Sequence, residues 1–149
     1  MTKMYDYRTI VVGTDGSPAS QHAVAHAAGV ANAADAHLVV VSAYKPKAGR
    51  AGPRQELVGE EAARSALRAS VQQLTSERTR QIDQRIVAED PAKALLDTAG
   101  TNPDNLIVVG NRGLGAAEGQ LLGSVPSEVV KNASCDVLIV QTSNLSEKT

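Results

Sequence analysis

The sequence predicts an α/β fold of Rossmann-like type: a single open parallel sheet of five strands in the order 3-2-1-4-5, with helices on both faces. Two observations predict it. Short runs of continuous apolar residues, typical of strands buried on both faces, alternate along the chain with segments of helical periodicity. The length of 149 residues and the apolar content of 42% fit one domain, with a core over about 8–142 and a frayed tail over 143–149.

Five segments are expected to form the strands. Four are dense in β-branched residues and leucine and do not alternate with polar residues, and the fifth, at Arg85, is weaker. In chain order the expected strands are Thr9–Val12, Leu38–Val41, Arg85–Ala88, Leu106–Val109 and Val137–Val140. Because helical segments separate them, we expect parallel pairing through right-handed crossovers.

Four helices are expected between and after these strands. The first follows Ser17-Pro18, a capping residue and a proline at the first helical position, and carries a stripe of alanine and valine as far as Ala34. The others are expected over Leu57–Arg80, over Pro91–Ala99 and from about Val125 onward. The stretch Lys45–Gly59, which is rich in proline, glycine and cations, is expected to be a long loop.

Composition excludes several classes of function. Fifteen basic and sixteen acidic residues give a net charge of -1, and three tyrosines stand without phenylalanine or tryptophan, so neither a field nor stacking platforms favour nucleic-acid binding. The single cysteine, Cys135, excludes an internal disulfide and is expected to be a small buried thiol. The chain has no apolar run of about 18 residues and no apolar stretch at its N-terminus, which predicts a cytoplasmic protein without membrane contact.

A ligand is expected where the order of the strands reverses. In the order 3-2-1-4-5 the first and fourth strands are neighbours, and ligands bind between the carboxyl ends of such a pair. The turns that leave these strands read GTDGS at 13–17 and GNRG at 110–113, and nine residues further on come Gly123 and Ser124. Glycine lets main-chain N–H groups approach a polyanion, and a helix opened by Ser124 adds its positive end. The sequence therefore predicts an anion site built from backbone amides.

Two well-known phosphate motifs are absent. A Walker A loop needs a lysine after its glycines, and no lysine lies between Gly110 and Val130. The dinucleotide fingerprint G-x-G-x-x-G fails as well, because Glu118 occupies its third position after Gly113, and Asp15 stands where the first turn would need its second glycine. The chain is neither a P-loop NTPase nor a typical dehydrogenase.

These residues resemble a known family. The spacing Gly110-x-x-Gly113, nine residues, Gly123-Ser124 after the strand LIVV, together with VVGTDGS and a final strand VLIV, is similar to the nucleotide-binding branch of the universal stress protein family, over about 8–142. The resemblance implies ATP or cyclic AMP in the crevice, with magnesium accompanying ATP, and nucleotide-dependent regulation of a stress response rather than strong catalysis. It also implies a homodimer formed through the last strand, Val137–Val140, and an unidentified protein partner.

The resemblance also implies a set of site residues. Asp15 would contact the base or ribose side, the backbone at Ala43 would face adenine, and Val109 with Gly110 would line the ribose. Gly113, Gly123, Ser124 and Val125 would hold phosphates, with Arg112 as a phosphate partner. The full set of expected nucleotide-binding residues is Gly13, Thr14, Asp15, Ala43, Val109, Gly110, Arg112, Gly113, Gly123, Ser124 and Val125.

Two alternative functions and two side features remain open. The chain could be a slow ATPase or an autophosphorylating enzyme, or a dimeric interaction scaffold without a ligand. The imidazoles of His22 and His26 lie four residues apart on the first helix, a spacing that suits a metal, but no third ligand is evident and a solvated face is the simpler interpretation. The basic stretch Lys45–Arg54 is expected to close over bound phosphates.

Overall fold

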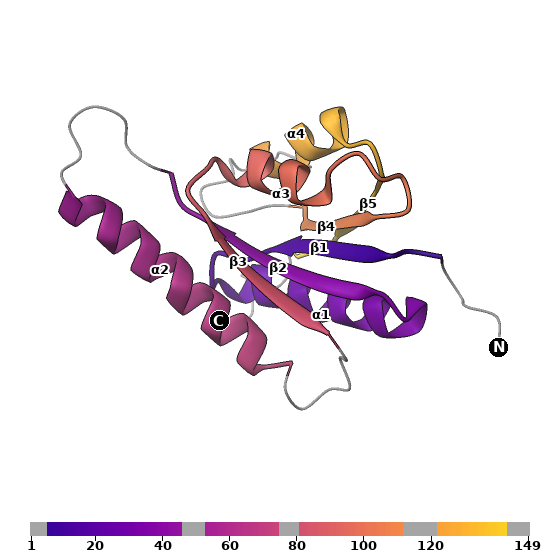
Figure 1. Ribbon diagram of the computed structural model, residues 1–149, viewed down its shortest axis with the longest axis horizontal. Coiled ribbons are helices and arrows are strands. Elements are labelled where there is room, and N and C mark those ends of the chain that lie inside the picture. The colour runs from indigo at the N-terminus through magenta and orange to yellow at the C-terminus, as the bar shows by residue number, and fades with distance from the viewer. Residues whose placement is uncertain (1–5, 46–52, 75–80, 112–121, 143–149) are drawn as a thin grey trace.

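The computed structural model describes residues 6–45, 53–74, 81–111 and 122–142, and within them five parallel strands form one sheet (Figure 1). The order is β3-β2-β1-β4-β5, as the sequence predicts. The strands are β1 (Thr9–Gly13), β2 (His37–Ala43), β3 (Ile82–Val87), β4 (Leu106–Gly110) and β5 (Asp136–Val140). The helices are α1 (Pro18–Ala34), α2 (Pro53–Gln72), α3 (Pro91–Ala99) and α4 (Ser124–Asn132). Figure 1 shows α1 and α2 on one face and α3 and α4 on the other.

The three central strands separate two apolar cores. Successive side chains of a strand point to opposite faces, so Ile10 and Val12 of β1 pack beneath α1 and α2, whereas Val11 packs beneath α3 and α4. The same alternation holds in β2 and β4. Because both faces are covered, these strands show continuous apolarity instead of alternation, which is the pattern that identifies them in the sequence.

Helix α1 begins and ends as the sequence predicts. The hydroxyl of Ser17, the residue before the helix, accepts the N–H of Ser20 at 3.2 Å, and Pro18 occupies the first turn. At the other end Asp35 adopts a left-handed conformation with φ 53°, and its N–H bonds the carbonyl of Ala31. Small alanines on the buried stripe let the helix lie close to the sheet.

The predicted third strand is wrong in its position. The expected segment was Arg85–Ala88, and the strand runs over Ile82–Val87. β3 forms an edge of the sheet: Ile82 and Ile86 pack against the core beneath α1 and α2, and the three polar residues between them are exposed. A strand with a polar middle lacks the continuous apolar run that identifies the other four strands in the sequence.

The second helix also differs from the prediction. It was expected over Leu57–Arg80 after a loop to Gly59, and it begins at Pro53 and ends at Gln72. Proline is favoured at the first helical position, so Pro53 starts the helix rather than prolonging the loop. At the other end the N–H of Leu74 bonds the carbonyl of Val71 and its side chain is buried, which turns the chain inward. Within the described residues, no helix is long and apolar enough to cross a membrane.

Candidate functional site

The exits of β1 and β4 separate at the carboxyl edge of the sheet, where the sequence predicts a ligand crevice. The two strands pair as far as Val12 and Val108. Beyond that point the N–H of Thr14 bonds the carbonyl of Val41 in β2 at 2.9 Å, and the N–H of Asn111 bonds the carbonyl of Val140 in β5 at 2.9 Å. The backbones therefore turn away from each other toward opposite edges of the sheet. This divergence at the carboxyl ends of adjacent strands is the geometry in which open α/β sheets bind ligands.

The turn after β1 is fixed by a cluster of hydroxyl groups. Thr14 is 7% exposed, and its hydroxyl lies 2.6 Å from the hydroxyl of Ser70 in α2 and 3.1 Å from that of Ser20 in α1. It also accepts the N–H of Gly16 at 3.1 Å. Because its N–H already bonds the carbonyl of Val41, the N–H and the hydroxyl of Thr14 are both engaged inside the protein. Its contribution to the site is to position the turn.

Asp15 is the exposed carboxylate of this turn. Its Oδ1 accepts the N–H of Ser17 at 2.9 Å, which closes a local turn. Burial raises the pKa of Asp15, but hydrogen bonds from Ser17 and Ser20 outweigh it, and the net pKa lies below the ordinary value. The carboxylate is thus ionised at neutral pH and can accept hydrogen bonds from hydroxyl or amine groups of a ligand.

Gly16 has a conformation that requires glycine. Its φ is +83°, and a Cβ built there would lie 3.2 Å from the Cβ of Ala66 in α2. Together with the Thr14 to Ser70 contact, this close approach packs the turn directly against α2. The turn is therefore held from both helices on that face of the sheet.

Asn111 lies at the exit of β4, on the side of the expected crevice that faces away from β2. It is 8% exposed, and its Oδ1 accepts both the N–H and the hydroxyl of Thr142, at 2.8 and 3.0 Å. Its carbonyl accepts the N–H of Gly123 at 2.8 Å, so the end of β4, the start of α4 and the end of β5 meet at one residue. The sequence pattern places Asn111 in the turn after β4 but gives no sign of its role, because its partners Gly123 and Thr142 lie 12 and 31 residues away in the chain.

The start of α4 has amides without an acceptor inside the helix. Gly123 is the residue before the helix and has no side chain to cap it, while Ser124 is the first helical residue. The first turn leaves the N–H groups of Ser124 and Val125 without intrahelical acceptors, and Pro126 has none to offer. The N–H of Gly123 bonds the carbonyl of Asn111, and the expected contact of Gly123 with a phosphate stays a prediction. Ser124 is exposed and Val125 is half-buried.

The remaining expected residues fall into two groups. Gly13, Ala43 and Gly110 end β1, β2 and β4 and are half-buried at the carboxyl edge of the sheet. Val109 is 5% exposed and its side chain belongs to the core beneath α3 and α4, which leaves only its main chain for a ligand. Arg112 and Gly113 lie outside the described residues and stay predictions.

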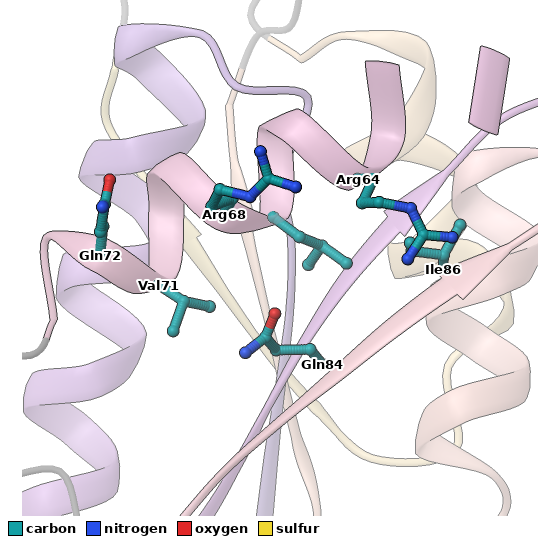
Figure 2. Close-up of a pocket in the computed structure, with 7 residues that line it drawn as sticks. Arg64, Arg68, Val71, Gln72, Gln84 and Ile86 are labelled. Carbon is teal, nitrogen blue, oxygen red and sulfur yellow. The ribbon is translucent and has the colours of Figure 1, made fainter. Parts of the chain in front are cut away.

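A separate hollow of about 500 Å³ lies away from the crevice, between α2 and the outer strand β3 (Figure 2). Its lining combines two arginines and two glutamines with an apolar floor. The residues that line it are Arg64, Leu67, Arg68, Val71, Gln72, Gln84 and Ile86. None of these belongs to the expected nucleotide site.

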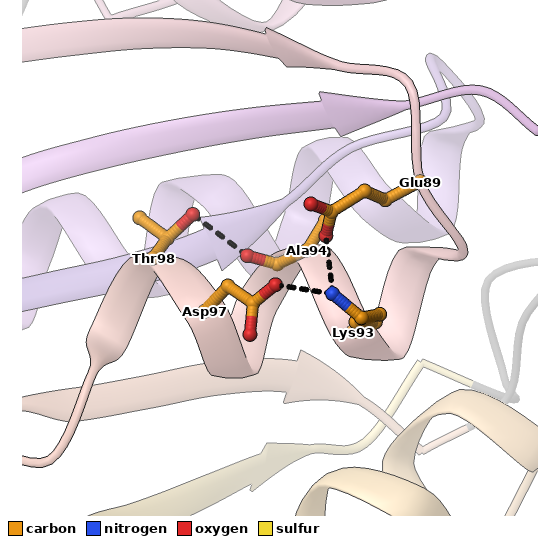
Figure 3. Close-up of polar contacts among 5 residues, drawn as sticks. All are labelled: Glu89, Lys93, Ala94, Asp97 and Thr98. Atoms are coloured by element: carbon orange, nitrogen blue, oxygen red, sulfur yellow. Dashed lines mark hydrogen bonds and ion pairs between the residues drawn. The ribbon is translucent and has the colours of Figure 1, made fainter.

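Two cations near the carboxyl edge of the sheet are already paired. The Nζ of Lys45, at the end of β2, lies 3.1 Å from a carboxylate oxygen of Asp90, the residue before α3. Lys93 in α3 lies 2.8 Å from Asp97 and 3.7 Å from Glu89 (Figure 3). The expected closure of the basic stretch over phosphates is thus opposed at Lys45 by its pairing with Asp90, and 46–52 lie outside the described residues.

The other residues singled out in the sequence lie elsewhere. His22 is half-buried and His26 is exposed on α1, with their rings 4.8 Å apart in an edge-to-face arrangement. The described residues contain no group of three histidine, cysteine or acidic side chains suited to a metal ion. Cys135 precedes β5 and is half-buried, not fully buried as expected.

The described residues form a Rossmann-like α/β sheet whose strand order reverses between β1 and β4. The sequence model of the universal stress protein family matches residues 6–141. The protein belongs to the universal stress protein family.

Relatives and solved structures agree with this assignment. The universal stress protein Rv1636 of Mycobacterium tuberculosis is 37% identical over 146 residues, covering 93% of this chain and 99% of the relative. A crystal structure of a universal stress protein in complex with cAMP is 36% identical, has a TM-score of 0.71, and matches over 92% of this chain and 98% of that chain. Universal stress protein UspA from Lactobacillus plantarum has a TM-score of 0.74 at 24% identity, over 91% of this chain and 98% of that chain, which shows the shared fold.

Proposed function

We propose that this protein binds an adenine nucleotide, ATP or cyclic AMP, in the crevice between the exits of β1 and β4, and that the bound nucleotide regulates its role in a stress response. The observation that carries the proposal is the divergence of the two exits after Val12 and Val108. The structure with cAMP, at 36% identity, supports an adenine nucleotide as the ligand.

The residues around the crevice fit such a ligand. The N–H groups of Ser124 and Val125, which have no acceptor inside the helix, suit phosphate oxygens at the positive end of α4. The ionised carboxylate of Asp15 suits donors on the ribose or the base. Ala43 would meet the adenine with its backbone. Magnesium would accompany ATP and screen the charge of its phosphates, while the protein supplies the amides.

Binding is a better description than catalysis. A hydrolase needs a positioned base or nucleophile. Among the described residues at the turn after β1, the hydroxyls of Thr14 and Ser20 are engaged with each other and with neighbouring helices, and the carboxylate of Asp15 accepts a backbone N–H. Slow hydrolysis or autophosphorylation is therefore the secondary proposal. Its test is ATP turnover by Asp15→Ala: loss of hydrolysis while nucleotide binding is retained would favour an enzyme.

The first experiment identifies the nucleotide. Freshly purified protein is denatured and released nucleotides are identified by mass spectrometry. The apo protein is then melted with ATP plus magnesium, with cyclic AMP and with AMP. A ligand at 100 times its Kd adds about 2.7 kcal/mol. For a chain of this size that raises the Tm by about 5 to 10 °C.

Matched glycine variants locate the binding. Gly123→Val adds bulk at the buried start of α4 and should abolish the nucleotide-induced shift. Gly29→Ala adds a methyl group to an exposed site on α1 with nothing within 4 Å, and should leave the shift unchanged. The absence of a shift with all three nucleotides, or an equal shift in Gly123→Val, contradicts the proposed site.

A homodimer through β5 is proposed alongside binding. β5 is an edge strand, and Ile139 on it is 37% exposed, while Val130 on the neighbouring helix α4 is 50% exposed. An apolar edge invites pairing with a second copy. Light scattering should give a dimer mass for the native protein and a monomer mass for Ile139→Asp; a native monomer contradicts the proposal. A dimer whose Tm does not change with any of the three nucleotides would favour the scaffold function.

A further inference from the structure

The outer edge of β3 directs backbone groups away from the sheet. In a parallel ladder alternate residues bond the neighbouring strand. The N–H groups of Leu38 in β2 and of Tyr44 just after it bond the carbonyls of Gln81 and Val87. The backbone N–H and C=O groups of the odd-numbered residues in 81–87 therefore point toward β2. The N–H and C=O groups of Ile82, Gln84 and Ile86 consequently face outward. Among the described residues no strand lies beyond β3.

The hollow between α2 and β3 lies beside the same backbone groups. Gln84 and Ile86, whose main chains face outward, also line the hollow with their side chains (Figure 2). An extended chain added next to β3 would therefore bond the backbone of these residues and place every second side chain toward α2. Leu67, 3% exposed, forms part of the apolar floor beneath it.

Two arginines give the hollow a positive charge. Arg64 and Arg68 are one helical turn apart on α2, about 6 Å along its axis. Alternate residues of an extended strand are about 6.6 Å apart, so two acidic side chains separated by one residue match the spacing of the two guanidinium groups. Arg64 already forms an exposed ion pair with Glu60 at 2.9 Å. Exposed pairs contribute little to stability, and the guanidinium keeps further donors for a second carboxylate. Carboxylates are the natural partners of both arginines.

A second copy of this chain does not suit this edge. Pairing two β3 strands about a twofold axis would bring the cationic hollows of both copies together, and like charges in contact oppose association. The exposed polar side chains of β3 contrast with Ile139 on the opposite edge strand β5. Polar side chains on an edge strand usually oppose pairing with another chain. Here the cationic hollow beside the edge favours a partner strand that carries acidic side chains.

We propose that the outer edge of β3 and the adjoining hollow dock an extended acidic segment of a partner protein, which adds to the sheet as a sixth strand. Backbone hydrogen bonds to Gln84 and Ile86 provide affinity, and carboxylates at alternate positions provide specificity through Arg64 and Arg68. This surface is separate from the nucleotide crevice and its use does not depend on the proposed nucleotide.

The test is a binding titration with the full chain. A fluorescently labelled nine-residue peptide with glutamate and valine at alternating positions is titrated by anisotropy, beside the same peptide with lysine in place of glutamate. The glutamate peptide should bind, more weakly as salt rises, and the lysine peptide should not. Equal binding of both peptides, or no binding of the glutamate peptide at millimolar protein, overturns the proposal.

Variants separate the two parts of the interaction. Arg64→Gln combined with Arg68→Gln should weaken binding by about tenfold or more, the effect expected of losing two charge-assisted contacts. Arg85→Gln, an exposed arginine on the opposite face of β3, is the matched control and should leave the affinity unchanged. An unchanged affinity in the double variant overturns the proposed role of the hollow.

Gln84→Pro removes an outward N–H without removing a bond to β2, and edge strands tolerate proline. It should weaken binding while circular dichroism stays native. If it does not fold, the double arginine variant and a competition decide instead. Free glutamate that displaces the peptide at the same concentration as the unlabelled peptide would show a site for small carboxylates and overturn strand addition.

Discussion

Replacing Asn111 by alanine tests its hydrogen bonds at the exit of β4. The side-chain oxygen of Asn111 accepts two hydrogen bonds from Thr142, and Thr142 is 2% exposed. Removing that oxygen breaks both hydrogen bonds. A hydrogen bond contributes about 1 kcal/mol to stability, so we expect a loss of about 2 kcal/mol in the free energy of unfolding. At about 2 to 4 °C per kcal/mol for a domain of this size, the Tm should fall by about 4 to 8 °C.

The assay is thermal and urea unfolding of the apo protein, with a matched asparagine as control. Asn132 is exposed at the end of α4, where its side chain donates to the carbonyl of Glu128 at 2.9 Å. Asn132→Ala should change the Tm by no more than about 2 °C, since surface substitutions usually cost under about 0.5 kcal/mol. Equal changes in the two variants would refute the reasoning that Asn111 holds β5 and α4 to the end of β4.

Three further predictions concern pH, glycine and the thiol. Hydrogen bonds to Asp83 and Gln81 raise the pKa of His37 above 6.5, so the stabilisation by its charged form is complete below pH 6.5 and is lost as pH rises through the higher pKa of the folded protein. His37→Gln should therefore lower the free energy of unfolding in urea more at pH 5.5 than at pH 8.5. Equal losses at the two pH values would contradict this. Gly29→Ala, in open space on a helix, should raise the free energy of unfolding by about 0.5 to 1 kcal/mol in chemical unfolding. Gly16→Ala, at a positive φ, should lower it by about 1 to 2 kcal/mol. A change of the same sign in both variants would contradict this. Desolvation raises the pKa of the Cys135 thiol, so it should react with a disulfide reagent at pH 7.5 more slowly in the native protein than in urea; equal rates would contradict this.

Four of the five strands could be predicted from local patterns, whereas β3 and the start of α2 could not. β1, β2, β4 and the edge strand β5 lie within one or two residues of their predicted positions because each carries a continuous apolar run. β3 has three exposed polar residues in its middle, and the proline that starts α2 has the same appearance as a loop proline. These two elements needed the tertiary context.

The candidate site divides in the same way. The neighbouring positions of β1 and β4 follow from the strand order, so the place where their exits separate could be predicted from the sequence. The hydrogen bonds of Asn111 to Gly123 and Thr142, and the pairing of Thr14 with Ser70, join positions 12 to 56 residues apart. Such pairings leave no periodic signal in the chain, and only the folded geometry identifies them.

The sheet insulates the two sides of the interior from each other. Val11 and Val12 are adjacent in the chain but belong to different compartments, each lined by its own pair of helices. Repacking on one side reaches the other only through the strand backbone, which neighbouring strands hold in place. Amino-acid replacements in one helical layer can therefore accumulate while the amides at the strand ends keep their arrangement, so the interior can diverge without loss of the crevice.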